Sequence, residues 1–312
     1  MAVATQLKSL AHSISFRSGI STAMARRQFC SRIVMYHGIT PPNAAAFAEQ
    51  LRYLVQNFRI VTLERLVQRF KRRSGPAGDE IALTFDDGLR NNWSVVYPLL
   101  KDLRAPATFF VCPGLIESGK WLWNHEVRCR LQSLPPESVM ELARYLSIPG
   151  QSIECIIAWM KGLDLDDRRR AEGVIRIATR RFAPSPEQRQ AYDMMTWQEL
   201  ARLDPALITV GSHSFSHPIL TTLDDGQLGA ELRESRRKLE ENLGRPVEYF
   251  CYPNGSLDSR VYRAVKREYS AAVTTESGLL DREAQPDPYR LPRIPSAEQA
   301  ALMAWRLHRP GA

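Results

Sequence analysis

Short apolar runs with the composition of buried β-strands recur along this chain, and helix-like segments separate them. The first four such runs lie at residues 33–36, 81–85, 107–111 and 207–210, and three later ones at 247–252, 271–274 and 291–294. Strands that alternate with helices are typical of parallel βα units. About seven such units predict an α/β fold with a barrel-like sheet, whose active site would lie at the carboxyl ends of its strands.

Residues from about 121 to 190 interrupt this alternation. They are helical in composition, are broken by Pro135-Pro136, Pro149-Gly150 and Pro184-Ser185-Pro186, and hold no convincing strand. We expect a helical insertion here that forms a flap over the site. The predicted organisation is a basic N-terminal helical segment at 1–30, a main domain at 31–300 with the insertion at about 121–190, and a C-terminal tail at 301–312.

The first 48 residues contain no Asp or Glu, whereas Lys8, Arg17, Arg26, Arg27 and Arg32 supply positive charge. Ser, His and Arg interrupt every apolar stretch, so this segment lacks the apolar region of a secretory signal. We expect a helical segment that rests on the domain, with peripheral contact to an anionic membrane face as the alternative. No apolar run of the sequence is long enough to cross a bilayer.

Charge and cysteine content narrow the classes of partner and compartment. The net charge is +8, but the basic residues are spread out, and a cluster such as Arg168-Arg169-Arg170 sits among helix formers. Such a cluster is typical of a solvated helix face, so we expect no nucleic-acid partner.

The five cysteines show no C-x-x-C spacing, which indicates reduced thiols in a reducing compartment. Together with the missing secretory signal, this predicts a cytoplasmic protein, with a peripheral position at the inner membrane face as the variant.

Two polar motifs follow predicted strands and carry the chemistry of the chain. One is Thr84-Phe85-Asp86-Asp87-Gly88 and the other is His213-Ser214-Phe215-Ser216-His217-Pro218. Gly88 permits a turn that brings the two carboxylates to one site, where one can bind a cation while the other accepts a proton. Two imidazoles and one carboxylate, with positions left open, suit zinc or another first-row ion in a catalytic role.

Each motif also has a purely structural interpretation. Asp-Asp-Gly on its own is most often a turn, and histidine pairs with small neighbours often only cap a helix. Both motifs, however, follow a buried strand within the same α/β alternation. Their joint occurrence favours the metal-ligand interpretation.

At these residues the chain resembles the polysaccharide deacetylase family, also called the NodB homology domain or carbohydrate esterase family 4. The resemblance covers roughly residues 32–296 and includes these further segments: Tyr36-His37-Gly38-Ile39, Ala107 to Val111, Tyr252-Pro253-Asn254-Gly255 and Leu291-Pro292-Arg293-Ile294. The first and last of these are closest to the branch that acts on bacterial exopolysaccharides. The resemblance implies a distorted (β/α)7 barrel, one divalent metal ion, usually zinc, and removal of acetyl groups from N-acetylated sugars.

The resemblance also implies a role for individual residues. Asp86 matches the base that deprotonates a metal-bound water, and Asp87, His213 and His217 match the metal ligands. The backbone N–H of Asn254 matches the donor to the tetrahedral oxyanion, which a changed side chain does not abolish. Tyr252 and Arg293 are expected at the same oxyanion or substrate surface.

Two positions depart from the family pattern. Cys251 stands where the motif has the arginine that orients the base, and Arg290 or Arg293 are the candidates to supply its charge. The late histidine that protonates the leaving amine has no clear counterpart, so His308 and His37 are the candidates for this acid.

Other ring-bearing residues receive a structural interpretation. We expect structural roles for His12 and His125. Trp93, Trp121 and Trp123 are expected as core or flap anchors rather than sugar-stacking groups.

The sequence therefore predicts a metal-dependent hydrolase that removes N-acetyl groups from a polysaccharide or a lipid-linked glycan intermediate. A metal-dependent amidase or esterase with a non-sugar substrate differs only in pocket contacts and stays open. A catalytically silent carbohydrate-binding domain is the third hypothesis, since Cys251 and the missing acid depart from the family. The intact set of Asp86, Asp87, His213 and His217 argues against it.

Overall fold

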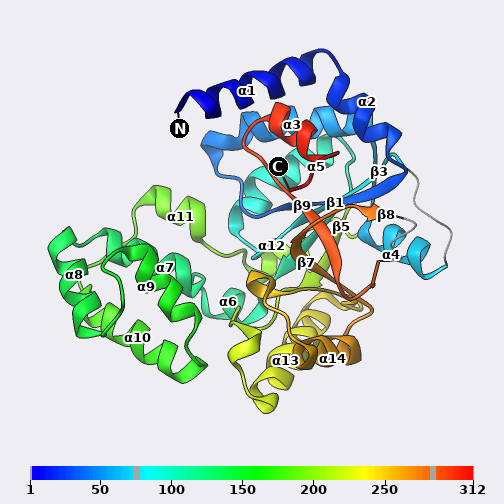
Figure 1. Cartoon of the computed structure of the whole chain (residues 1–312). Coiled ribbons are helices and arrows are strands. Elements are labelled where there is room, and N and C mark those ends of the chain that lie inside the picture. Colours follow the sequence, from blue (N-terminus) through cyan, green and yellow to red (C-terminus); the bar gives the residue numbers. More distant parts are fainter. Residues whose placement is uncertain (1, 73–77, 282–285, 312) are drawn as a thin grey trace.

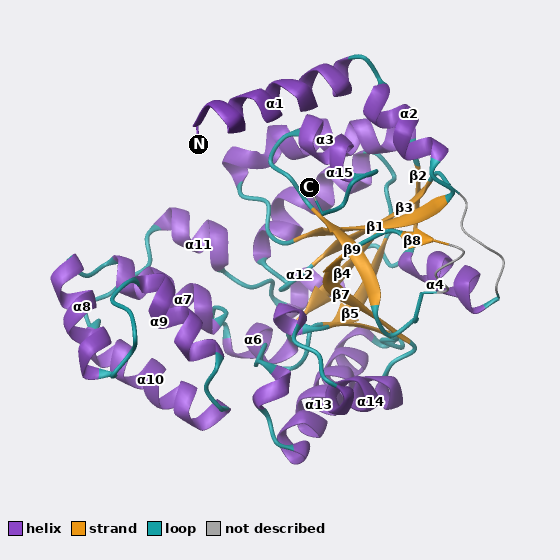
Figure 2. Ribbon diagram, viewed as in Figure 1, coloured by secondary structure: helices purple, strands orange, loops and turns teal. Residues whose placement is uncertain are grey.

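Seven parallel strands close into a barrel in the computed structural model, which describes residues 2–72, 78–281 and 286–311 (Figures 1 and 2). The barrel strands are β1 (Cys30–Tyr36), β3 (Glu80–Phe85), β4 (Ala107–Val111), β5 (Ile208–Ser212), β6 (Tyr249–Cys251), β7 (Ala271–Ser277) and β9 (Leu291–Pro295). Neighbours follow the order β3-β4-β5-β6-β7-β9-β1, and pairing of β1 with β3 closes the ring. The predicted distorted (β/α)7 barrel is confirmed.

Two short strands distort the ring. β2 (Arg59–Val61) pairs with residues 80–82 of β3, while β4 pairs with residues 83–85, so these two strands share one edge of β3. β8 (Leu280–Asp281) is antiparallel to the start of β1. Both strands are too short for an alternating pattern to reveal them in the sequence.

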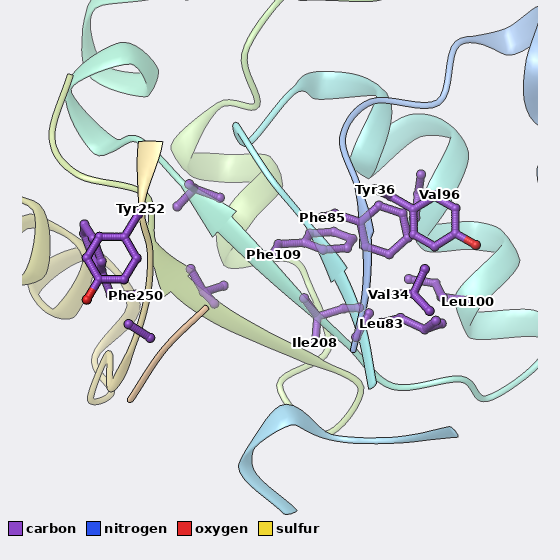
Figure 3. Close-up of a cluster of buried hydrophobic side chains, with 14 of the residues drawn as sticks. Val34, Tyr36, Leu83, Phe85, Val96, Leu100, Phe109, Ile208, Phe250 and Tyr252 are labelled. Carbon is purple, nitrogen blue, oxygen red and sulfur yellow. The ribbon is translucent and has the colours of Figure 1, made fainter. Parts of the chain in front are cut away.

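Alternate residues of each barrel strand face opposite sides of the sheet, as the pleat requires. One set packs beneath the surrounding helices and includes the labelled side chains Val34, Leu83, Phe85, Phe109 and Ile208 (Figure 3). The other set forms a separate buried cluster that includes Ile33, Ala82, Phe110, Cys251 and Leu291. Thr84 and Arg293 follow this second set by two positions and contact each other across the ring. The second set therefore lines the barrel interior.

Helices surround the barrel and bury the first set. They are α3 (Ala44–Asn57), α5 (Tyr97–Asp102), α6 (Pro113–Ser118), α12 (Trp197–Ala201), α13 (Asp225–Leu243) and α14 (Ser259–Glu268). The helix α4 (Leu63–Lys71) instead packs against the second set, through Leu63, Leu66 and Val67. Thr196 and Glu199 form a capping box at the start of α12. Gly244, at φ 64°, ends α13 in the left-handed conformation that favours glycine.

The predicted interruption of the barrel pattern is a group of helices between α6 and α12. They are α7 (Trp123–Gln132), α8 (Pro136–Tyr145), α9 (Ile153–Lys161), α10 (Leu165–Ala178) and α11 (Pro186–Tyr192). Val127, Leu131, Leu142, Ile156 and Ile175 belong to a core of their own. Figure 1 shows α7 to α10 as a separate green group beside the barrel.

The two ends of the chain pack together. α1 (Ala2–Arg17) and α2 (Ile20–Arg27) lie on the outside, and α1 packs against α15 (Ala300–Arg306) (Figure 1). Met303, Ala304 and Leu307 are buried, so the expected C-terminal tail is a helix of the main body. Within the described residues, no helix combines the length and apolar character that a membrane span requires.

Candidate active site

The aspartate motif leaves the barrel at the carboxyl end of β3. The backbone N–H of Asp86 donates to the carbonyl of Tyr36 at 3.0 Å, which continues the sheet by one residue. The chain then turns sharply, because Asp87 and Gly88 have φ values of 76° and 75°. A Cβ at Gly88 would lie 3.0 Å from Val111, so the turn needs glycine for space as well as conformation. Both carboxylates are buried as a result.

Arg293 from β9 holds the carboxylate of Asp86. Its two terminal nitrogens lie 2.7 Å from Oδ1 and Oδ2 of Asp86, in a bidentate ion pair with no exposed guanidinium surface. The guanidinium also contacts Thr84 Oγ1, the Thr274 carbonyl and Cys251 Sγ. Of the two arginines considered for the charge lost at Cys251, Arg293 is placed to supply it, whereas Arg290 is exposed and pairs with Glu276. The expected substrate contact of Arg293 is wrong, because protein groups enclose it.

The histidine motif folds into a tight loop after β5. The N–H of His213 donates to the carbonyl of Val111, and the N–H of His217 donates to Ser214 Oγ. Glu231 on α13 accepts from the N–H groups of Phe215 and Ser216. Ser214 and His217 have φ values of 63° and 57°, a strained conformation for residues with a side chain. This loop turns both imidazoles toward the aspartates.

The two imidazoles converge on Asp87. Nε2 of His213 and Nε2 of His217 each lie 3.5 Å from Oδ1 of Asp87. That is long for a hydrogen bond, but ligands at about 2.1 Å from a tetrahedral zinc ion are about 3.4 Å apart. Nδ1 of His213 lies 2.8 Å from the Cys251 carbonyl, which directs its Nε2 inward as an outer partner of a metal ligand does. The donor set therefore fits a divalent cation.

Asp86, His213 and Cys251 form a second compact set of potential ligand atoms. Burial raises the pKa of the Cys251 thiol, although Arg293 opposes this effect, so the sulfur is held as a thiol. Asp86 in this set is already bound by Arg293 through both oxygens. The set of Asp87, His213 and His217 is the better cation site.

Charges in the cluster are strongly coupled. Burial alone would raise the pKa of Asp86, but Arg293, His213 and His37 more than offset it, and the pKa lies below its ordinary value. Burial is likewise outweighed at Asp87 by His213, His37 and His217, so its pKa is also lowered. Burial and the charge of His213 lower the pKa of His217 to about 3. Both carboxylates are therefore ionised at neutral pH, and His217 is neutral as a ligand must be.

The segment after β6 is divided between core and surface. Asn254 is exposed, has a φ of 53°, and its backbone N–H has no acceptor among the described residues, so it is available to an oxyanion. Tyr252 is fully buried beside Phe250 (Figure 3), and its hydroxyl donates to the Tyr289 carbonyl. The expected substrate contact of Tyr252 is therefore wrong, since its ring and hydroxyl belong to the core.

His37 and His125 flank the cluster. His37 follows β1, is exposed, and lies close enough for its charge to lower the pKa values of Asp86 and Asp87. His125 lies in the first turn of α7, and its pKa responds to Asp87 and His37, although burial is the largest influence and lowers it. The interpretation of His125 as purely structural missed this position. No sequence signal could have revealed it, because the insertion folds back onto the barrel.

The contact between the insertion and the aspartate loop positions His125. Its ring lies 4.5 Å from the ring of Tyr192, and Nδ1 is buried without a hydrogen-bond partner among the described residues. The residues after Tyr192 pair with the aspartate loop, through Arg90 N–H to the Asp193 carbonyl and Met195 N–H to the Gly88 carbonyl. The insertion is thus fixed to the site's rim.

His308 does not reach the cluster. It follows α15, and its carbonyl accepts from Gln28, just before β1. The neighbouring Leu307 carbonyl accepts from Arg32 near the start of β1. His308 therefore lies at the amino end of the barrel strands, opposite Asp86, and the expectation that it acts as the acid is wrong. His12 also lies at this packing surface, where its ring contacts Trp305.

Comparison with protein families decides the class of this site. The model described as polysaccharide deacetylase matches residues 73–272, more than half of the chain. The chain belongs to the polysaccharide deacetylase family. The resemblance noted in the sequence is thereby confirmed, as is the prediction of a deacetylase that acts on N-acetylated glycans. No functionally curated protein matches the sequence significantly.

Solved structures of deacetylases share the fold. The Streptococcus pyogenes deacetylase PplD, solved with acetate, is 18% identical with a TM-score of 0.59, over 88% of this chain and 96% of that one. IcaB from Ammonifex degensii is 19% identical with a TM-score of 0.58, over 88% and 97%. The BpsB deacetylase domain from Bordetella bronchiseptica is 13% identical with a TM-score of 0.55, over 86% and 96%. At these identities the likeness concerns the fold alone.

Proposed function

We propose that this chain is a metal-dependent deacetylase that removes N-acetyl groups from a polysaccharide or a lipid-linked glycan intermediate. The observation that carries the proposal is the convergence of His213, His217 and Asp87, with both Nε2 atoms 3.5 Å from one carboxylate oxygen. These three residues would hold one divalent cation, with zinc favoured by two imidazoles and one carboxylate. When bound, the cation supplies a Lewis acid for the acetyl carbonyl and for a water molecule.

The chain's own residues supply the proton transfers. Asp86, kept ionised and oriented by Arg293, accepts a proton from the attacking water. Water oxygen bonds to the acetyl carbon, and the oxyanion that develops is stabilised by the backbone N–H of Asn254. The C–N bond then breaks, acetate leaves, and an imidazolium protonates the amine. His37 is the proposed donor, because it is exposed beside both aspartates.

A cavity beside the histidine loop supports a glycan as substrate. It has a volume of about 360 Å³, is bordered by Ser216 of the loop, and is lined by Trp121 and Trp123 together with charged residues: Lys120, Glu126, Arg168, Arg169, Glu172 and Arg176. Both tryptophans are largely buried, as expected for anchors, and present only part of their surface to the cavity. Aromatic rings beside many hydrogen-bonding groups suit a sugar, whose ring faces are apolar and whose edges carry hydroxyls. The non-sugar amidase lacks a specific observation in its favour.

The silent carbohydrate-binding hypothesis loses its main support. It depended on the arginine missing at Cys251, and Arg293 holds the base instead through two 2.7 Å contacts. It also depended on a missing acid, for which His37 and His125 are candidates because their charges and those of the aspartates influence one another.

The test is acetate release from a panel of N-acetylated oligosaccharides and lipid-linked N-acetylated sugars, with and without a chelator. Asp86→Asn should abolish turnover and keep the metal, whereas His213→Ala and His217→Ala should lose metal as measured by elemental analysis. His308→Ala is the matched control, because this histidine lies at the other end of the barrel. Undiminished zinc in the His213 and His217 variants would refute the ligand assignment.

The same panel separates the two candidate proton donors. If His37 is the donor, His37→Gln removes the basic limb of the pH–rate profile and His125→Gln leaves it in place. The reverse result transfers the role to His125.

A further inference from the structure

Two outward stripes of the N-terminal helices repeat the same spacing. In α1, Leu10 and Ile14 are one turn apart and Arg17 follows at the next turn; all three are exposed. Residues at i, i+4 and i+7 of a helix share one face. The opposite face of α1 is fixed to the body, since His12 contacts Trp305 and Phe16 contacts Tyr53. The apolar stripe therefore points away from the protein.

The second stripe lies on α2. Ile20, Met24 and Arg27 are exposed and have the same i, i+4, i+7 spacing, while Ser21 and Ala25 are buried on the inner side. Phe29 follows directly and is 81% exposed, the highest exposure of any large apolar side chain among the described residues. Each stripe thus consists of two aliphatic residues followed by an arginine.

Apolar exposure is concentrated in this region. Of the eight large hydrophobic residues that are exposed in the described part of the chain, five lie between positions 10 and 29. A single exposed aliphatic residue is ordinary, but a gathering of this kind marks an interaction surface. Figure 1 shows α1 at the edge of the molecule, with α3 and α15 on its inner side.

The positive charge of these helices favours an anionic membrane over a second copy of the chain. The first acidic residue of the chain is Glu49, and Arg17, Arg26 and Arg27 are all exposed on these helices. A second copy bound through the same face would bring like charges together without a compensating carboxylate. A bilayer with anionic headgroups accepts aliphatic side chains below the headgroups and arginines at their level.

We propose that the outward face of α1 and α2, defined by Leu10, Ile14, Ile20, Met24 and Phe29 with their neighbouring arginines, docks on an anionic membrane surface. The helices lie in the plane of the interface and do not cross it. The proposal is independent of the proposed catalytic function, since none of these residues touches the barrel's active end.

The test is co-sedimentation of the full chain with vesicles of phosphatidylcholine alone and with vesicles that contain roughly a third phosphatidylglycerol, an anionic lipid that gives the surface a negative potential. We expect binding to the anionic vesicles, weak binding to neutral ones, and a steep loss at high salt. Leu10→Ser/Ile14→Ser/Phe29→Ser should reduce the partition coefficient at least about tenfold, because the variant loses three apolar side chains that the bilayer would bury. These side chains are exposed, so the variant should fold normally, which circular dichroism checks.

Matched controls keep the result specific. Met140→Ser/Ile177→Ser removes two exposed apolar side chains of the insertion and should leave binding unchanged. Arg17→Gln should weaken binding to anionic vesicles about fivefold, as expected for one basic residue near the surface. Equal binding of wild type and the triple variant, or no binding to anionic vesicles, would overturn the proposal. So would a dimer in light scattering that the triple variant converts to monomer, because the face would then be occupied by a second copy.

Discussion

Arg293 reaches Asp86, the proposed base, from β9, whereas the arginine of the family motif would stand at Cys251 on β6. We predict that Arg293→Met destabilises the fold by on the order of 3–5 kcal/mol, because it leaves Asp86 ionised and unpaired in the interior. The guanidinium holds the pKa of Asp86 below its ordinary value, so its removal raises that pKa. As the proposed base Asp86 must be ionised, so the acidic limb of the pH–rate profile should move to higher pH. Urea unfolding and the profile of kcat/KM measure the two effects.

Arg290→Met is the matched control for this prediction. Arg290 lies three residues earlier, is exposed, and pairs only with Glu276 on the surface. A surface ion pair contributes about 0–1 kcal/mol, so this variant should unfold and titrate like the wild type. An unmoved acidic limb in Arg293→Met would show that Asp86 does not depend on Arg293.

At the residue level, the sequence predicted what local patterns encode. Asp86, Asp87, His213 and His217 were found because their two motifs stand at the carboxyl ends of strands, where side chains from separate motifs meet. The choice between Arg293 and Arg290 depends on which residues of β9 face the barrel interior. The structure places Arg293 on the inward side with Leu291. Tyr252 and His308 were misplaced because burial and packing partners depend on elements far along the chain.

Among the secondary-structure elements, one side chain adds to the backbone hydrogen bonds that join the insertion to the barrel. Asn91 is buried; it accepts from the Ile39 N–H and donates to the Gln190 and Ala191 carbonyls. It thereby joins the loop after β1, the loop after β3 and the end of α11. We predict that Asn91→Ala costs about 2 kcal/mol, because buried backbone groups lose their partners.

Hydrogen exchange locates the effect of Asn91→Ala. Amides of residues 37–41 and 186–195 should exchange faster, while the barrel strands keep their protection. Asn242→Ala is the control, because the Asn242 side chain makes one exposed bond to the Lys238 carbonyl. Uniform loss of protection over the whole chain would contradict a local joint.

The order of strands and helices was predictable from the sequence, but their packing was not. The barrel strands were predictable because buried parallel strands give continuous apolar runs. The insertion was recognised by its helical composition and its prolines, and α11 ends two residues beyond the expected limit of about 190. Where it docks was not predictable, because the pairing of Met195 with Gly88 joins segments that share no sequence pattern.

For the whole molecule, the proposed cation would tie together two strands that are not neighbours, because β4 lies between β3 and β5. A ligand that binds only the folded state stabilises it by about 2.7 kcal/mol at a hundredfold excess over its Kd. For a chain of 312 residues this predicts that zinc raises Tm by roughly 4 °C. His217→Ala and Asp87→Asn should lose this increment and His308→Ala should keep it, as differential scanning calorimetry with and without zinc can measure. The increment should also fall at acidic pH, because protons compete with the metal for the imidazoles and the carboxylate. A zinc-dependent rise in Tm that persists in His217→Ala would show that the stabilising cation binds at a site that does not include His217.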